Sequence, residues 1–178
     1  SESEISQIEK ISKKKKKIVD VGIRLNPNIN PNTIKKITTG RKEDKFGLTD
    51  INCLKIIKKI KISKHLKLKC LSVHIGSQIT NHNPYVKMLK VVGSIIKNSK
   101  HNFDFIDLGG GMGIKYTKDT KTFNYKKYNL ILRNFLKKNK TRIIFEPGRS
   151  IVGNTAMLLT RILYIKKTEK INFVILDA

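Results

Sequence analysis

Strand-like and helix-like segments alternate along the first 150 residues, and no other feature of the sequence limits the fold as strongly. Short apolar runs, several of them β-branched, predict strands at 18–25, 68–75, 103–108 and 142–145. Apolar residues at helical spacing predict helices at 3–12, 50–62, 84–98 and 125–138, the second of them capped by Asp50. This alternation is typical of βαβ units, so we expect an α/β fold with a parallel sheet.

The pattern changes after about residue 150. Two strand-like runs, 156–165 and 172–176, follow each other there without a helix. We therefore expect residues 1–150 to belong to the α/β part and residues 151–178 to lead into a β-domain. The chain's 178 residues suffice for one domain with a core, whereas a complete eight-unit β/α barrel needs roughly 250. Because the sequence opens inside a helix-like segment and stops just after a strand, we expect an incomplete fold.

Three short motifs come directly at the ends of three predicted strands. They are HIGSQ at 74–78, DLGGGMG at 107–113 and EPGR at 146–149. In α/β sheets and barrels, ligands bind at the edge formed by the carboxyl ends of the strands. The three motifs together therefore predict one site at this edge, and their chemistry suits a phosphorylated cofactor.

The glycine-rich motif at 107–113 is suited to binding a phosphate. Gly109, Gly110 and Gly111 leave backbone N–H groups free to approach a phosphate. The dinucleotide-binding fingerprint is excluded because position 114 is Ile. Together with Asp107, the loop is also similar to the cofactor loop of S-adenosylmethionine-dependent methyltransferases. Such enzymes place an acidic residue roughly 20 residues further on, and residues 125–141 contain neither Asp nor Glu, which disfavours that alternative.

The HIGSQ motif contributes an imidazole ring, and the EPGR motif contributes a carboxylate and a guanidinium. His74 ends an apolar strand, where a lone His is more often a structural residue, but the adjacent Ser77 offers a hydroxyl to an anion. Glu146 and Arg149 are separated by a glycine. They could form a local salt bridge of little energetic consequence. Alternatively, the carboxylate could hold a protonated ring nitrogen while the guanidinium binds a substrate carboxylate.

The composition disfavours several other classes of protein. The formal net charge is +25, which would suit nucleic-acid binding, but 32 Lys against 6 Arg, scattered over the chain, indicate a solvated basic surface instead. Cys53 and Cys70 are far apart and predict neither a disulfide framework nor a metal site, in keeping with a reducing cytoplasm. The sequence shows no membrane-spanning run and no signal peptide.

At these motifs the chain resembles the diaminopimelate decarboxylases, pyridoxal-phosphate enzymes built on an alanine-racemase-like barrel. The stretches that carry the resemblance are RLNP at 24–27, TG at 39–40, KFG at 45–47, HIGSQ at 74–78, LGGGMGI at 108–114, EPGRSIV at 146–152 and VILDA at 174–178. They cover nearly the whole chain in order. The resemblance implies the later half of a (β/α)8 TIM-type barrel followed by the start of a C-terminal β-domain.

The resemblance also implies a role for each site residue. His74 would pack on the face of the pyridoxal ring, and Ser77 with the backbone of the three glycines would hold its phosphate. Glu146 would keep the pyridine nitrogen protonated, with Gly148 in the same cofactor-binding loop. Arg149 would touch cofactor and substrate, holding the substrate carboxylate that is not lost. The implied reaction converts meso-2,6-diaminopimelate to L-lysine and CO2, in a homodimeric enzyme.

The catalytic groups of the family are expected to lie outside this sequence. The Schiff-base lysine belongs to the first barrel strand and the catalytic cysteine to the C-terminal β-domain, so no catalytic residue is assigned here. Two alternatives stay open: a related decarboxylase of basic amino acids, and a non-catalytic remnant of the family. The 178 residues alone are expected to fold poorly, because an incomplete barrel leaves sheet edges unpaired.

Overall fold

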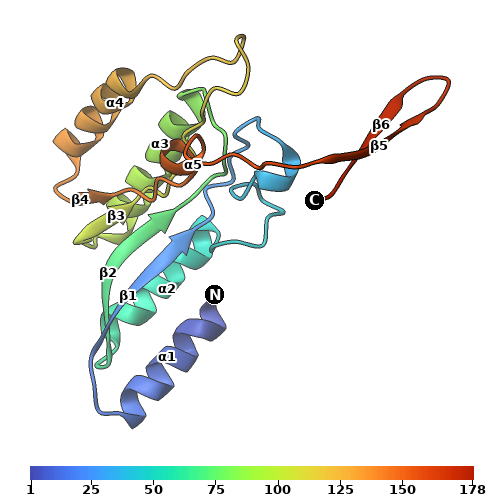
Figure 1. The fold of residues 1–178 in the computed structure, drawn as a ribbon. Coiled ribbons are helices and arrows are strands. Elements are labelled where there is room, and N and C mark those ends of the chain that lie inside the picture. Colours follow the sequence, from blue (N-terminus) through green and yellow to red (C-terminus); the bar gives the residue numbers. More distant parts are fainter.

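The computed structural model describes residues 1–178, except for the side chain of Lys35, and centres on a four-stranded parallel sheet (Figure 1). The strands are β1 (Val19–Leu25), β2 (Leu66–Val73), β3 (Phe105–Asp107) and β4 (Arg142–Ile144). The longer helices are α1 (Glu2–Lys14), α2 (Asp50–Ile62), α3 (Asn83–Ser99) and α4 (Tyr125–Lys138). A 3-10 turn (Lys35–Ile37), a short helix α5 (Arg149–Val152) and a two-stranded hairpin of β5 (Ile162–Lys167) and β6 (Asn172–Leu176) complete the fold.

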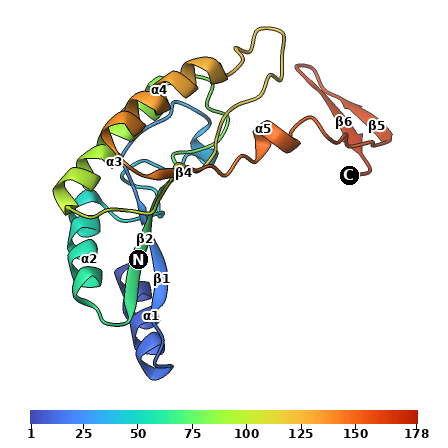
Figure 2. The ribbon, with the colours of Figure 1, turned by 90° about the vertical axis from the view of Figure 1, so that its left-hand side faces the viewer.

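The order of the strands identifies the sheet as barrel-like. Each strand pairs in parallel with the one that precedes it in the chain, giving the order β1-β2-β3-β4. In doubly wound sheets the order reverses at a switch point, whereas in a β/α barrel successive strands are neighbours throughout. Helices α2, α3 and α4 all lie along the same face of the sheet (Figure 2). The predicted α/β fold of the TIM-barrel type is confirmed, and its assignment to the later half of the barrel stays a prediction.

The helices begin where local side chains satisfy their first N–H groups. Helix α2 is capped by Thr49, whose hydroxyl accepts from the N–H of Asn52 at 3.3 Å. Asp50 is therefore the first helical residue and not the cap. Its negative charge lies in the first turn, where it interacts favourably with the positive end of the helix dipole. Helix α4 is capped by Asn124, whose side chain accepts from the N–H of Lys127 at 2.9 Å.

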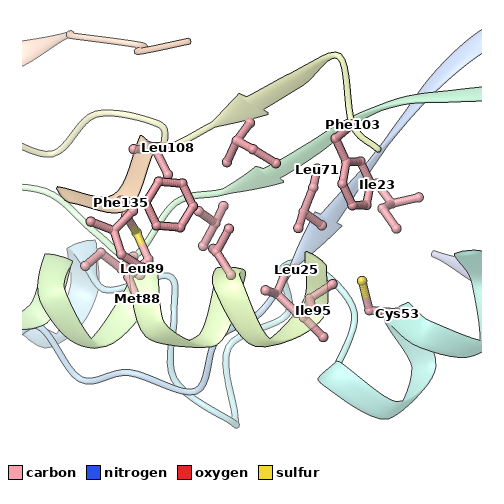
Figure 3. Packing of buried hydrophobic residues seen from close by; sticks show 14 of the residues in the cluster. Ile23, Leu25, Cys53, Leu71, Met88, Leu89, Ile95, Phe103, Leu108 and Phe135 are labelled. Atoms are coloured by element: carbon pink, nitrogen blue, oxygen red, sulfur yellow. The ribbon is translucent and has the colours of Figure 1, made fainter. Parts of the chain in front are cut away.

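The hydrophobic core lies between the sheet and the helices that cover it. Alternate strand residues such as Ile23, Leu71 and Ile106 point into this layer and are almost completely buried. Residues from α3 and α4, including Met88 and Phe135, complete it (Figure 3). The intervening strand residues are less buried, so the core occupies the helix-covered face of the sheet.

The chain leaves the α/β layers after α5. Strands β5 and β6 form an antiparallel hairpin that extends away from the parallel sheet in both views (Figures 1 and 2). The two predicted strands follow each other without a helix, although β5 begins at Ile162 and not at 156, and the assignment of residues 151–178 to a β-domain stays a prediction. Residues 156–159 are apolar, which suggests a strand, but the ladder with β6 starts only at Ile162. None of the helices in the described chain is long and apolar enough to cross a membrane.

Candidate functional site

Three loops meet at the carboxyl edge of the sheet, and they are the three loops that carry the sequence motifs. The N–H of Gly110, after β3, donates to Nδ1 of His74, after β2, at 3.2 Å. The N–H of Glu146, after β4, donates to the carbonyl of Gly109 at 2.8 Å. The glycine loop therefore lies between the other two and contacts both, so His74, Gly109, Gly110 and Glu146 lie at one edge of the sheet.

His74 is held by its backbone from the β1 side. Its carbonyl accepts from the Thr39 hydroxyl at 2.9 Å and lies 3.5 Å from Nη2 of Arg24. Because Nδ1 accepts a hydrogen bond, the ring proton of the neutral form belongs on Nε2. Burial lowers the pKa of His74 below its ordinary value of 6.5, and the Arg24 cation lowers it further, while Asp107 opposes both. The ring is therefore neutral near pH 7.

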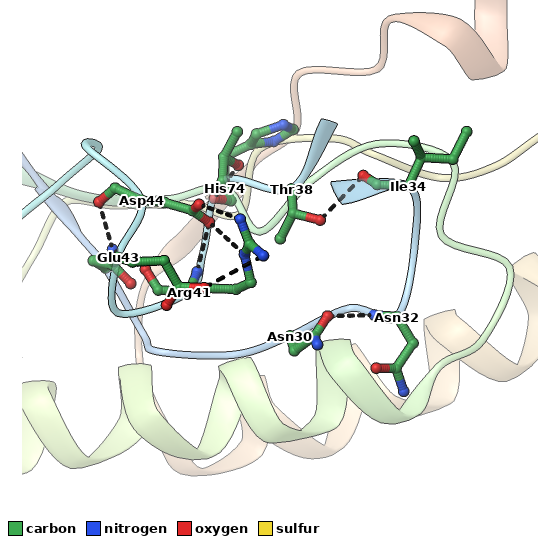
Figure 4. Close-up of polar contacts among 10 residues, drawn as sticks. Asn30, Asn32, Ile34, Thr38, Arg41, Glu43, Asp44 and His74 are labelled. Atoms are coloured by element: carbon green, nitrogen blue, oxygen red, sulfur yellow. Dashed lines mark hydrogen bonds and ion pairs between the residues drawn. The ribbon is translucent and has the colours of Figure 1, made fainter. Parts of the chain in front are cut away.

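The segment after β1 that supports His74 is braced by an ion pair. Nη2 of Arg41 lies 2.9 Å from Oδ1 of Asp44, and the backbone N–H of Arg41 donates to Oδ2 at 2.8 Å. Figure 4 shows this pair together with His74 and Thr38. The hydrogen bonds from Arg41 lower the pKa of the Asp44 carboxyl. The ion pair holds the loop together internally, and the Thr39 hydroxyl and N–H, which donate to the carbonyls of His74 and Ile75, join the loop to the end of β2.

Glycine is required in the middle loop because the neighbouring backbone comes too close for a side chain. A Cβ atom at Gly110 would lie 2.1 Å from the carbonyl oxygen of Glu146, and one at Gly111 would lie 2.1 Å from that of Gly76. Gly111 also has φ of +90°, a conformation that other residues rarely adopt. The glycines thus allow three loops to approach at backbone contact.

The donors of the glycine loop are not equivalent. The N–H of Gly109 donates to Oδ1 of Asp107 at 2.8 Å, and that of Gly110 is used by His74. Within the described residues, no hydrogen bond uses the N–H of Gly111 or the hydroxyl of Ser77. Of the predicted phosphate donors, these two groups are the ones available to an anionic ligand.

Glu146 and Arg149 present charges at the end of β4. The Glu146 side chain is exposed, and in the described part of the chain no ion pair joins it to Arg149. Arg149 is half-buried and its Nη1 donates to the hydroxyl of Tyr116 at 3.2 Å. A Cβ at Gly148 would meet no atom within 4 Å. The local salt bridge is therefore not formed, and both charges remain available to ligands.

Several residues that organise the site have no role in the prediction from the sequence. Arg24 and Asp107 set the charge around His74. Gln78 joins the loop after β2 to the loop after β3. Its Nε2 donates to the carbonyl of Ile114 at 2.6 Å, and its Oε1 accepts from the Ile114 N–H at 3.2 Å. Gln78 belongs to the HIGSQ motif and Arg24 to the RLNP stretch at the end of β1, so both stand in segments that the sequence singles out, but the spacing alone predicts neither contact.

The charge of His74 provides a first testable prediction. We expect its NMR titration midpoint to lie below 6.5, and to rise in Arg24→Gln because a repelling cation is removed. At a pH just below 6.5 the unfolded chain binds a proton at this residue and the folded chain does not. The free energy of unfolding therefore falls as the pH is lowered through this window. Arg142→Gln, which alters no group that acts on His74, is the control, and an unchanged midpoint in Arg24→Gln would contradict the assignment.

Comparison with known proteins agrees with this arrangement. The family described as "Pyridoxal-dependent decarboxylase, pyridoxal binding domain" matches residues 1–153. The diaminopimelate decarboxylase of Zymomonas mobilis is 34% identical over the whole chain, which spans 43% of that protein. That of Methanocaldococcus jannaschii is 33% identical over 99% of the chain, which spans 42% of it.

A solved structure extends the likeness to three dimensions. Diaminopimelate decarboxylase from Helicobacter pylori, complexed with L-lysine, superposes with a TM-score of 0.89 at 35% identity. It covers the whole of this chain, which spans 45% of that chain. The resemblance predicted from the motifs is confirmed, and the chain belongs to the pyridoxal-dependent decarboxylases.

Proposed function

We propose that the polypeptide carrying this chain converts meso-2,6-diaminopimelate to L-lysine and CO2 with pyridoxal 5′-phosphate, the last step of lysine biosynthesis. The observation that carries the proposal is the meeting of the His74, glycine and Glu146 loops at one sheet edge. Relatives named diaminopimelate decarboxylase match along the whole chain, and the structure of one of them is a complex with L-lysine. Because the chain spans less than half of these relatives, the activity is assigned to the whole protein.

The residues at the edge suit pyridoxal phosphate chemically. An anionic phosphate requires hydrogen-bond donors, and among the predicted donors the Gly111 N–H and the Ser77 hydroxyl have no partner in the described chain. A flat aromatic ring packs well against another planar ring, and His74 offers a neutral imidazole near pH 7. A protonated pyridine nitrogen requires a hydrogen-bond acceptor beside it, and Glu146 presents an exposed carboxylate. The three requirements are met by three adjacent loops.

Each side chain then has a defined task. Glu146 keeps a proton on the pyridine nitrogen, and His74 packs against the ring face. Arg149 binds the substrate carboxylate that is retained, for which the planar fork of a guanidinium is suited. The chemistry that bound pyridoxal phosphate supplies is an electron sink for the electron pair left when CO2 departs. These residues together orient the bond that breaks and exclude competing orientations.

The catalytic lysine and cysteine are assigned to parts of the protein outside residues 1–178. Neither cysteine present suits the role: Cys53 is buried, which raises the pKa of its thiol to about 12, and burial also raises the pKa of Cys70. Residues 1–150 form part of the pyridoxal-binding barrel in this proposal, and residues 151–178 lead into the β-domain. The whole enzyme is proposed to be a cytoplasmic homodimer, as the resemblance implies.

The proposal is tested by the substrate preference of the polypeptide as its source cell makes it. CO2 release is measured with meso-diaminopimelate, L-ornithine, L-arginine and L-lysine, each with added pyridoxal phosphate. We expect diaminopimelate to be the preferred substrate and L-lysine the product. Preference for ornithine or arginine would replace the proposal with a related decarboxylase. Absence of both bound cofactor and turnover would replace it with a non-catalytic remnant.

A further inference from the structure

Tyr85 reaches the glycine loop from beneath the sheet edge. It lies near the start of α3, its side chain is completely buried, and its hydroxyl donates to the carbonyl of Gly110 at 3.0 Å. Burial raises the pKa of Tyr85 far above its ordinary value, so the hydroxyl keeps its proton and remains a donor. The sequence motifs give no sign of this contact, because Tyr85 follows the HIGSQ segment inside an apolar helix face.

The contact fixes the direction of the one unused N–H in the glycine triplet. The carbonyl of Gly110 and the N–H of Gly111 belong to the same peptide unit, and the chain contains no cis peptide bond. In a planar trans peptide the C=O and N–H point in opposite directions. Since the carbonyl points toward α3, the N–H of Gly111 points away from α3. Within the described residues it has no hydrogen-bond partner.

This peptide unit needs an anchor because glycine flanks it on both sides. A peptide flip changes ψ of Gly110 and φ of Gly111, and glycine tolerates either sign of φ at little cost. The preceding peptide is held by the bond from Gly110 N–H to His74, and the following one by the bond from Ile79 N–H to the Gly111 carbonyl. In the described chain, the unit between them is held only by Tyr85.

We propose that Tyr85 is a positioning residue that aims the Gly111 N–H at the phosphate of the bound cofactor. The inference rests on the proposed pyridoxal-phosphate site. Tyr85 itself touches neither cofactor nor substrate: it acts through the orientation of one peptide. Its loss should therefore weaken recognition of the phosphate and leave recognition of the pyridoxal ring unchanged.

The experiment compares two buried tyrosines that pack against each other. The rings of Tyr85 and Tyr128 lie 4.9 Å apart, and Tyr128 is 4% exposed. The hydroxyl of Tyr128 has no hydrogen-bond partner among the described residues, so Tyr128→Phe is the matched control for Tyr85→Phe. Each substitution is introduced into the full-length polypeptide that the source cell makes. The apoprotein is then titrated with pyridoxal 5′-phosphate and, separately, with pyridoxal, which lacks the phosphate.

We expect Tyr85→Phe to weaken binding of pyridoxal phosphate about tenfold, equivalent to about 1.4 kcal/mol, and to change pyridoxal binding less than about twofold. Tyr128→Phe should change neither. Equal losses for the two ligands would indicate general loosening of the fold and would overturn the inference, as would an unchanged affinity for pyridoxal phosphate. If the unmodified protein itself bound neither ligand, the proposed function would fail first, and the two failures are thus distinguishable.

Discussion

Replacing Gly110 with alanine is expected to lower the free energy of unfolding by about 3 kcal/mol, the upper end of the usual cost of overpacking. The new methyl group would lie 2.1 Å from the carbonyl oxygen of Glu146, which is backbone and cannot rotate away. This steric clash is removed only if the loops after β3 and β4 separate, and that movement breaks the hydrogen bond from the Glu146 N–H to the Gly109 carbonyl. The same movement displaces Gly110 from His74, so binding of pyridoxal phosphate should be lost as well.

Denaturant unfolding and a cofactor titration measure both effects, and Gly93→Ala is the control. Gly93 lies inside α3, where an added Cβ would be 3.7 Å from the Phe135 ring, an ordinary contact. Alanine favours a helix over glycine by about 1 kcal/mol, so this control should keep or raise stability. A Gly110→Ala protein with normal stability and normal cofactor affinity would show that the three loops do not meet as described.

Glu146→Gln is expected to reduce turnover by about 10²- to 10³-fold, the usual effect of removing one preorganised electrostatic contact to the reacting system. Glutamine has the same shape but lacks the carboxylate that, in the proposed site, would keep a proton on the pyridine nitrogen. Within the described residues the Glu146 carboxylate makes no ion pair, so folding should not change. CO2 release gives the turnover, and the absorbance of bound pyridoxal phosphate shows whether the cofactor is retained.

The matched control is Glu169→Gln, in the exposed connection between β5 and β6. It removes the same charge away from the parallel sheet and should leave turnover unchanged. Two results would count against the role of Glu146: a variant that turns over at the normal rate, and a loss of turnover of the same size in both variants, which would point to net charge as the cause.

Much of the fold follows from the sequence because its signals are local. The apolar spacing predicts α4 at its observed bounds, and α3 and β1 within one residue at each end. The predicted cap of α2 is wrong by one residue, since Thr49 and Asp50 are both good caps and only the geometry selects between them. Helix α5 is not predicted because its four residues carry no periodicity.

The site could be predicted only as far as its residues follow strands. Parallel strands end at a common edge, and this rule alone predicts that His74, Gly110 and Glu146 lie close together. The same rule could not show that Gly109 and Gly110 use their N–H groups inside the protein, leaving Gly111. It also could not find Tyr85 and Arg24, because hydrogen bonds between distant segments depend on side-chain direction and not on spacing.

The measurement that tests the account most directly is a crystal structure of the native-length polypeptide with pyridoxal 5′-phosphate. We expect density at the carboxyl edge of the parallel sheet, with the ring against His74, the phosphate at Gly111 N–H and Ser77, and the ring nitrogen facing Glu146. Density bound elsewhere on the protein, or a phosphate held away from the glycine loop, would contradict the site described here.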